Sequence, residues 1–138
     1  MTVRNVRFRH QATYMPWGID RSMRPYVSCA LAANGRHTTI TALIDSGADG
    51  CRFPLSVGED LGFNFDGSMA ETSSGFGGPS FVYRRTIDLT FARRTFQVEA
   101  RFDPLAHDWQ VVLGRQGFFS QFLIGFEEPR QSIYFLPL

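Results

Sequence analysis

The chain has 138 residues, a formal net charge of +1 and 43% hydrophobic residues. This length and composition are typical of one folded domain and exclude an intrinsically disordered chain. The near-neutral charge and scattered arginines exclude a recognisable nucleic-acid module. No apolar run approaches the roughly 20 residues that span a bilayer, and the first ten residues lack the apolar core of a secretory signal. We therefore expect no nucleic-acid or membrane partner and a cytoplasmic location.

The first half of the chain predicts short strands. A strand is expected near Val6–His10, followed by irregular chain. A second strand at Tyr26–Ala32 should pair with a return strand at Arg36–Ile44, because Asn34-Gly35 between them is a strong signal for a two-residue hairpin. The return strand alternates β-branched and apolar residues with polar ones, which predicts one buried face.

The middle of the chain predicts one short helix and a second hairpin. Pro54 and the apolar residues after it, up to Leu61, indicate a helix of about two turns. The glycine-rich stretch Thr72–Gly78 could be a flexible loop, but we expect a mobile hairpin tip because strand-like residues follow it at once. The runs Thr86–Phe91 and Thr95–Phe102 alternate on both sides of a turn at residues 92–94, as in a β-hairpin.

The C-terminal part predicts a loop, a buried strand, a helix and two more strands, at 103–108, Val111–Leu113, Gly117–Phe122, Leu123–Phe126 and Ser132–Leu136, with a turn at 127–130. Many short strands with two short helices indicate a mostly β barrel. Asp103, His107 and Asp108 form a weak metal motif, so we expect a solvated loop without metal. Cys29 and Cys51 are expected to be reduced and half-buried.

One candidate for chemistry is the stretch Thr41–Phe53, T-A-L-I-D-S-G-A-D-G-C-R-F. An apolar run delivers Asp45 into a turn that contains Ser46 and Gly47. A carboxylate at the end of a buried strand needs hydrogen-bond donors, which a serine hydroxyl and the amides of such a turn can supply. By itself a D-S-G tripeptide is far more typical of an ordinary strand-loop-strand with an Asx-turn aspartate.

A second stretch, Trp109–Arg115, is another buried run that ends at a glycine, Gly114. The two stretches, with Gly75-Phe76-Gly77-Gly78 between them, resemble the signature of the retropepsin-like aspartic proteases. The resemblance extends from about Pro25 to the C-terminus, and implies a domain at 25–138 behind an N-terminal arm at 1–24. It implies a closed acid-protease β-barrel, mostly β with one or two short helices.

This resemblance also implies an activity. Aspartic proteases use two carboxylates that share one proton, because like charges a few ångströms apart do not both ionise readily. The chain contains the D-S-G motif once, so an active form should be a homodimer in which Asp45 pairs with its symmetry mate. The reaction implied is hydrolysis of polypeptide by a water that the Asp45 pair activates, without a cofactor. Two alternatives stay open: a non-catalytic peptide-binding or dimerisation module on the same fold, and an unrelated protein in which Asp45 lies far from 111–114.

The resemblance assigns roles within the first motif. Ser46 would bond across the dimer, Gly47 would let the substrate backbone approach closely and accept a hydrogen bond, and Ala48 would complete the active-site loop. Asp49 would receive substrate main-chain contacts, and Arg115 would pair with that acid in a fork. As an alternative, Asp49 and Arg115 are ordinary surface charges.

Further roles fall outside that motif. Gly114 would let its strand pack beneath the active-site loop, and a flap would close over the substrate and exclude water, formed by Gly75, Phe76, Gly77 and Gly78. Phe76 is alternatively core, and Phe118-Phe119 fits helix packing better than a specificity pocket. Gly50-Cys51 and the long N-terminal arm depart from the family pattern, which leaves the dimer contacts open.

Overall fold

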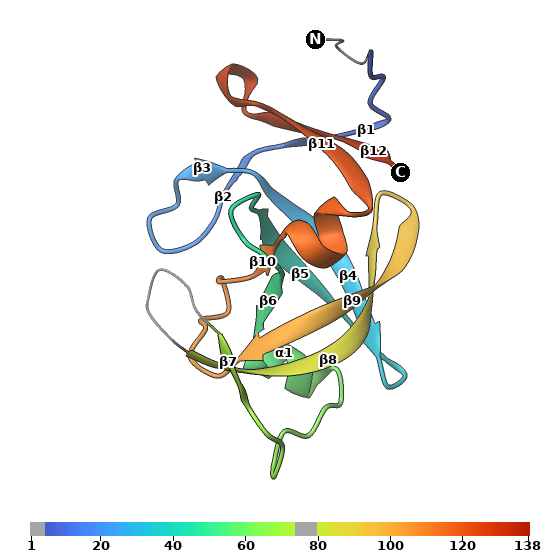
Figure 1. Ribbon diagram of the computed structural model, residues 1–138. Coiled ribbons are helices and arrows are strands. Elements are labelled where there is room, and N and C mark those ends of the chain that lie inside the picture. Colours follow the sequence, from blue (N-terminus) through green and yellow to red (C-terminus); the bar gives the residue numbers. More distant parts are fainter. Residues whose placement is uncertain (1–4, 74–79) are drawn as a thin grey trace.

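The computed structural model describes residues 5–73 and 80–138 and consists mainly of strands (Figure 1). The strands are β1 (His10–Thr13), β2 (Met15–Pro16), β3 (Met23–Arg24), β4 (Tyr26–Ala33), β5 (Arg36–Ile44), β6 (Cys51–Pro54), β7 (Glu71–Ser73), β8 (Ser80–Phe91), β9 (Arg94–Asp103), β10 (Val112–Leu113), β11 (Phe122–Glu127) and β12 (Ser132–Pro137). The helical segments are α1 (Leu55–Asp60), a helical turn at Arg115–Phe119 and a 3-10 turn at Glu128–Arg130. Within the described ranges no helix is long and apolar enough to cross a membrane.

Six strands close into a barrel in the order β4-β5-β10-β6-β9-β8, because β8 also pairs with β4. β7 extends the sheet beyond β8. Alternation along each strand fills the interior: in β9 the side chains of Phe96, Val98, Ala100 and Phe102 are buried, whereas most of the residues between them are exposed. The predicted mostly β barrel is confirmed.

Both predicted hairpins are present. Asn34 and Gly35 have φ values of 54° and 71°, the left-handed pair that a tight hairpin turn requires, and β4 pairs with β5 on either side. Asn34 Nδ2 also donates to the carbonyl of Leu61, 2.9 Å away, which ties the turn to the end of α1. The β8–β9 hairpin turns at Ala92 and Arg93, which both have positive φ without being glycine.

The N-terminal strand lies at His10–Thr13, so its expected position at Val6–His10 is wrong. It is fixed by antiparallel pairing with β12, whose other side pairs with β11. The arm continues into the core through Tyr14, which is 3% exposed and donates its hydroxyl to Glu128 Oε2 over 3.0 Å. The three-stranded terminal sheet therefore packs the beginning of the chain against its end (Figure 1).

Three smaller predictions are corrected. The helix expected at Gly117–Phe122 is a helical turn at Arg115–Phe119, because Gly117 has a φ of 96° and β11 begins at Phe122. Asp103 is buried, not solvated: its Oδ1 accepts from the Leu105 amide at 2.8 Å, whereas His107 and Asp108 are exposed as predicted. Both cysteines, Cys29 and Cys51, are free but fully buried, because they face the barrel interior.

Candidate active site

The two sequence motifs meet at the end of β5. β10 pairs parallel with β5, and Leu43 donates its amide to the carbonyl of Val111 over 2.9 Å. Two residues later Asp45 donates its amide to the carbonyl of Leu113 over 3.1 Å. Asp45 therefore lies beside residues 111–114, which contradicts the alternative of an unrelated protein in which the two are far apart.

The carboxylate of Asp45 is held by its own turn. Its Oδ1 accepts from the Gly47 amide at 2.8 Å, and its carbonyl accepts from the Ala48 amide at 3.2 Å. The Asx-turn left open by the sequence is thus present. Asp45 is half-buried, while Ser46 and Gly47 are exposed. Among the described residues Oδ2 has no hydrogen-bond partner.

Gly114 lies directly beneath this loop. A Cβ atom at Gly114 would lie 2.3 Å from the Gly50 carbonyl oxygen and 2.5 Å from that of Ala48. Beyond it the amides of Arg115 and Gln116 donate to the carbonyls of Ala48 and Asp49, at 2.9 and 2.8 Å. The loop therefore rests on the backbone of residues 114–116, an approach that only glycine permits at the contact point.

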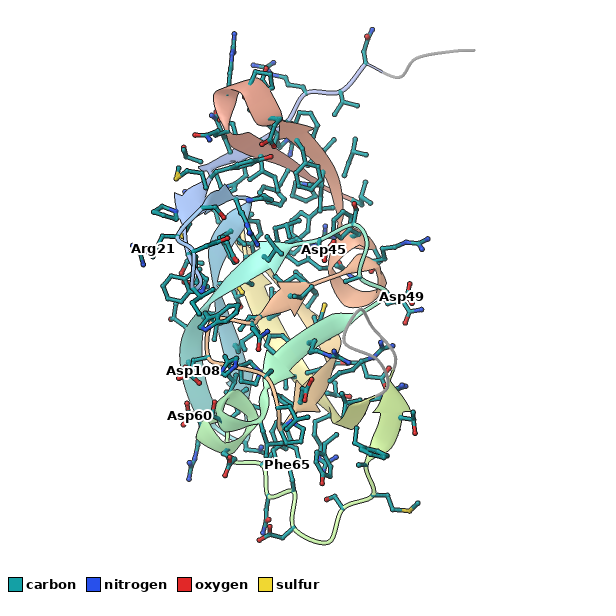
Figure 2. All side chains as sticks on the ribbon, turned by 90° about the vertical axis from the view of Figure 1, so that its left-hand side faces the viewer. Arg21, Asp45, Asp49, Asp60, Phe65 and Asp108 are labelled. Atoms are coloured by element: carbon teal, nitrogen blue, oxygen red, sulfur yellow. The ribbon has the colours of Figure 1, made fainter. Side chains whose placement is uncertain are left out.

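An open cavity of about 480 Å³ adjoins the loop, lined by Ser46, Asp49, Arg115, Gln116, Phe119 and Ser120. Figure 2 shows Asp45 and Asp49 near the helical turn that follows β10. The expected fork between Asp49 and Arg115 is not formed within the described part of the chain, although both residues line the cavity.

Two aromatic side chains of the helical turn have different environments. Phe118 is fully buried, as expected for core packing. Phe119 is half-buried: it packs against the core and also lines the cavity. The sequence favours helix packing for Phe119, so it was missed as a site residue. The only signal in the sequence is that Phe119 follows Gln116 by three residues, the spacing of neighbours on one helix face. The break in the helix at Gly117 hides this signal. The predicted flap residues, Gly75, Phe76, Gly77 and Gly78, lie outside the described residues.

Cys51 lies under the loop but is not a nucleophile. It is 0% exposed, and its thiol donates to the Gln116 carbonyl over 3.5 Å. Burial raises the pKa of this thiol to about 11, so it stays protonated at neutral pH. Since the thiolate is the reactive form, the loop presents carboxylate chemistry and not thiol chemistry.

No protein-family model and no curated protein matches the chain. Among solved structures, a retropepsin-like aspartic protease from Rickettsia conorii matches with a TM-score of 0.62 and 15% identity, over 91% of this chain and 98% of that one. The EIAV protease complexed with the inhibitor HBY-793 matches with a TM-score of 0.52 and 18% identity, over 67% of this chain and 82% of that one. At these identities the similarity is one of fold.

Proposed function

We propose that this chain, which has the fold of the retropepsin-like aspartic proteases, is an aspartic endopeptidase that acts as a homodimer. The observation that carries the proposal is the placement of Asp45. Its backbone is bound to Leu113, one carboxylate oxygen is held by Gly47, and the other is free of protein partners among the described residues. This placement of the carboxylate in a partly exposed loop supports the proposal that Asp45 is the catalytic group.

The chemistry requires a second carboxylate. Two neighbouring carboxyl groups that share a proton can divide the work: the ionised one takes a proton from water, and the protonated one donates a hydrogen bond to the scissile carbonyl. The water oxygen then attacks the carbonyl carbon to give a tetrahedral intermediate, the proton taken from water is passed to the amide nitrogen, and the C–N bond breaks to release the amine and a carboxylic acid. One chain offers one such loop, so a second copy supplies the partner carboxylate across a two-fold axis.

The terminal sheet limits how a second copy can bind. Both sides of β12 are occupied within the chain, by β1 and by β11. A partner strand that extends this sheet would therefore add at the outer edge of β1 or of β11. The substrate is proposed to be an extended polypeptide, which can add its backbone beside existing strands.

The test compares wild type with Asp45→Asn on a mixed peptide library at several pH values from acidic to neutral. We expect cleavage to fall by about 10²–10⁴-fold or more, because the asparagine cannot exchange a proton. Asp60→Asn is the matched control, since it removes the same charge from the exposed end of α1. Size-exclusion chromatography on the same samples should show that activity follows the dimer.

Two results would count against the proposal. Cleavage retained by Asp45→Asn would exclude this carboxylate as the catalytic group. A confirmed, folded dimer that cleaves no member of the library would support the non-catalytic peptide-binding module instead.

A further inference from the structure

Strands β6, β9 and β8 are neighbours in the barrel sheet (Figure 1), and each carries one arginine at a paired position. Arg52 is the register partner of Arg101, and Arg101 is the register partner of Arg84. Directly paired residues point to the same face of a sheet, with Cβ atoms about 5 Å apart. The three side chains therefore form one row, which we call the arginine row.

The arginine row is on the face of the sheet that carries Asp45. In β5 the buried residues are Ala42 and Ile44, so Leu43 and Asp45 point away from the barrel interior. Val112 is paired with Leu43 on one side and with Arg52 on the other. The outward row thus runs without a break from β5 through β10 to the three arginines.

Arg101 reaches back toward the active-site loop. A Cβ atom at Gly50 would lie 3.0 Å from Arg101 Cζ and 3.3 Å from its Nε and Nη1. The guanidinium group therefore packs against the loop, one residue after Asp49. Arg101 is half-buried, so solvent screens its charge only in part.

The charges around the row are unevenly compensated. Arg52 Nη1 lies 3.6 Å from the buried Asp103, and Arg84 lies 3.0 and 3.3 Å from Glu71 and Glu99. Arg101, between them, has no ion pair or hydrogen bond in the described part of the chain. Like charges directly opposite each other across strands are destabilising, so a cation in the middle position favours a bound anion.

We propose that Arg101, flanked by Arg52 and Arg84, binds an aspartate or glutamate side chain of the polypeptide substrate. This inference rests on the proposed function, because it places the acidic residue in a peptide that extends to Asp45. A guanidinium fork matches a carboxylate in geometry and charge. The flanking arginines are paired with acids, namely Asp103, Glu71 and Glu99. These negative charges beside the row disfavour a polyanion such as nucleic acid.

The position of the acidic residue follows from strand spacing. β9 is three strand spacings from β5, or about 14 Å, and an extended peptide advances about 3.3 Å per residue. The acidic side chain is therefore expected within about four residues of the cleaved bond.

The test uses pools of extended decapeptides that are identical except for one fixed position, which carries glutamate in one pool and glutamine in the other. One pair of pools is made for each position of the decapeptide. For one of these positions the wild type should cleave the glutamate pool about tenfold faster than the glutamine pool, as expected for a charge-assisted pair at a half-buried site. Arg101→Gln should remove this preference, and Arg101→Lys should retain part of it without the fork. Raising the salt concentration from roughly 0.05 to 0.5 M should weaken the wild-type preference.

Arg93→Gln is the matched control. Arg93 is exposed in the turn of the same β8–β9 hairpin, about 26 Å along β9 from Arg101. This variant loses the same charge and should keep the preference for glutamate. Thermal unfolding of each variant verifies that the barrel is intact.

A binding measurement separates this inference from the proposed function. Fluorescence anisotropy of the same labelled pools on Asp45→Asn should show tighter binding of the glutamate pool, lost again when Arg101→Gln is added. That result with no cleavage by the wild type would refute the protease and keep the acidic subsite. Equal cleavage and binding of the two pools by the wild type, no binding of either pool, or a preference that survives Arg101→Gln, would overturn the subsite.

Discussion

Replacing Gly114 by alanine should destabilise the protein through the active-site loop alone. The backbone of Gly114 has φ −111° and ψ −165°, an extended conformation open to any residue, so alanine adds no backbone strain there. Its Cβ atom, however, would lie 2.3 Å from the Gly50 oxygen and 2.5 Å from the Ala48 oxygen, well inside the 3.0 Å that such contacts respect. Both obstacles are backbone atoms, so the loop itself must move.

The cost can be worked out from the hydrogen bonds that join the loop to the strand below. Asp45 is bound to Leu113 at 3.1 Å, and residues 115 and 116 are bound to Ala48 and Asp49 at 2.9 and 2.8 Å. At about 1 kcal/mol for each bond lost, the variant should lose about 3 kcal/mol of unfolding free energy. That is a large share of the 5–15 kcal/mol typical of a single domain.

Urea unfolding followed by circular dichroism measures this loss, with Gly35→Ala as the matched control. Gly35 has φ 71° and no atom within 4 Å of an added Cβ, so its substitution costs only backbone strain, about 1–2 kcal/mol. Peptide cleavage by Gly114→Ala should also fall, because the Asp45 carboxylate is displaced with the loop. If Gly114→Ala is no more destabilising than Gly35→Ala, the loop does not rest on this glycine as argued.

Two further predictions concern stability. Burial raises the pKa of Cys29 to about 12 and that of Cys51 to about 11, from an ordinary 9.0, so the unfolded chain releases these protons first. The buried thiols therefore contribute fully to the free energy of unfolding below about pH 9. This contribution is lost as the pH rises toward 11–12, by up to about 1.4 kcal/mol per pH unit for each thiol. Urea unfolding measures the fall in the free energy of unfolding between about pH 8 and pH 10. This fall should be smaller in the double variant Cys29→Ala/Cys51→Ala than in the wild type, and an equal fall in both would contradict the prediction. Asn34→Ala should lower the free energy of unfolding by about 2 kcal/mol, measured by thermal unfolding. The substitution removes the hydrogen bond to Leu61 and replaces a residue type that tolerates a φ of 54°. A loss below about 0.5 kcal/mol would mean that the turn does not depend on Asn34.

Local signals predicted the parts of the fold that short-range chemistry decides. Asn34-Gly35 fixes its hairpin through positive φ values, and alternation in 95–102 identifies the buried face of β9. The meeting of Asp45 with 111–114 was predicted from the resemblance, and the Asp45–Leu113 hydrogen bond bears it out.

Long-range pairing explains what the sequence did not reveal. The first strand lies at 10–13 because β12 pairs with it there, and nothing within the arm itself indicates that register. The arginine row depends on the mutual register of three strands, so Arg52, Arg84 and Arg101 looked scattered in the sequence. Asp103 is buried because the end of β9 packs against β6, which a loop-like composition does not indicate.

The pairing of β1 with β12 also sets an order of events in folding. The β4–β5 and β8–β9 hairpins join neighbours in the sequence and can form early, whereas Gln11 and Ser132 are 121 residues apart. Closing so long a loop costs entropy before any contact offsets it, and such contacts slow folding. The addition of β1 to the terminal sheet is therefore expected to come last, because β11 and β12 are themselves neighbours in the sequence; until then, the edge of β12 that pairs with β1 stays open to other chains.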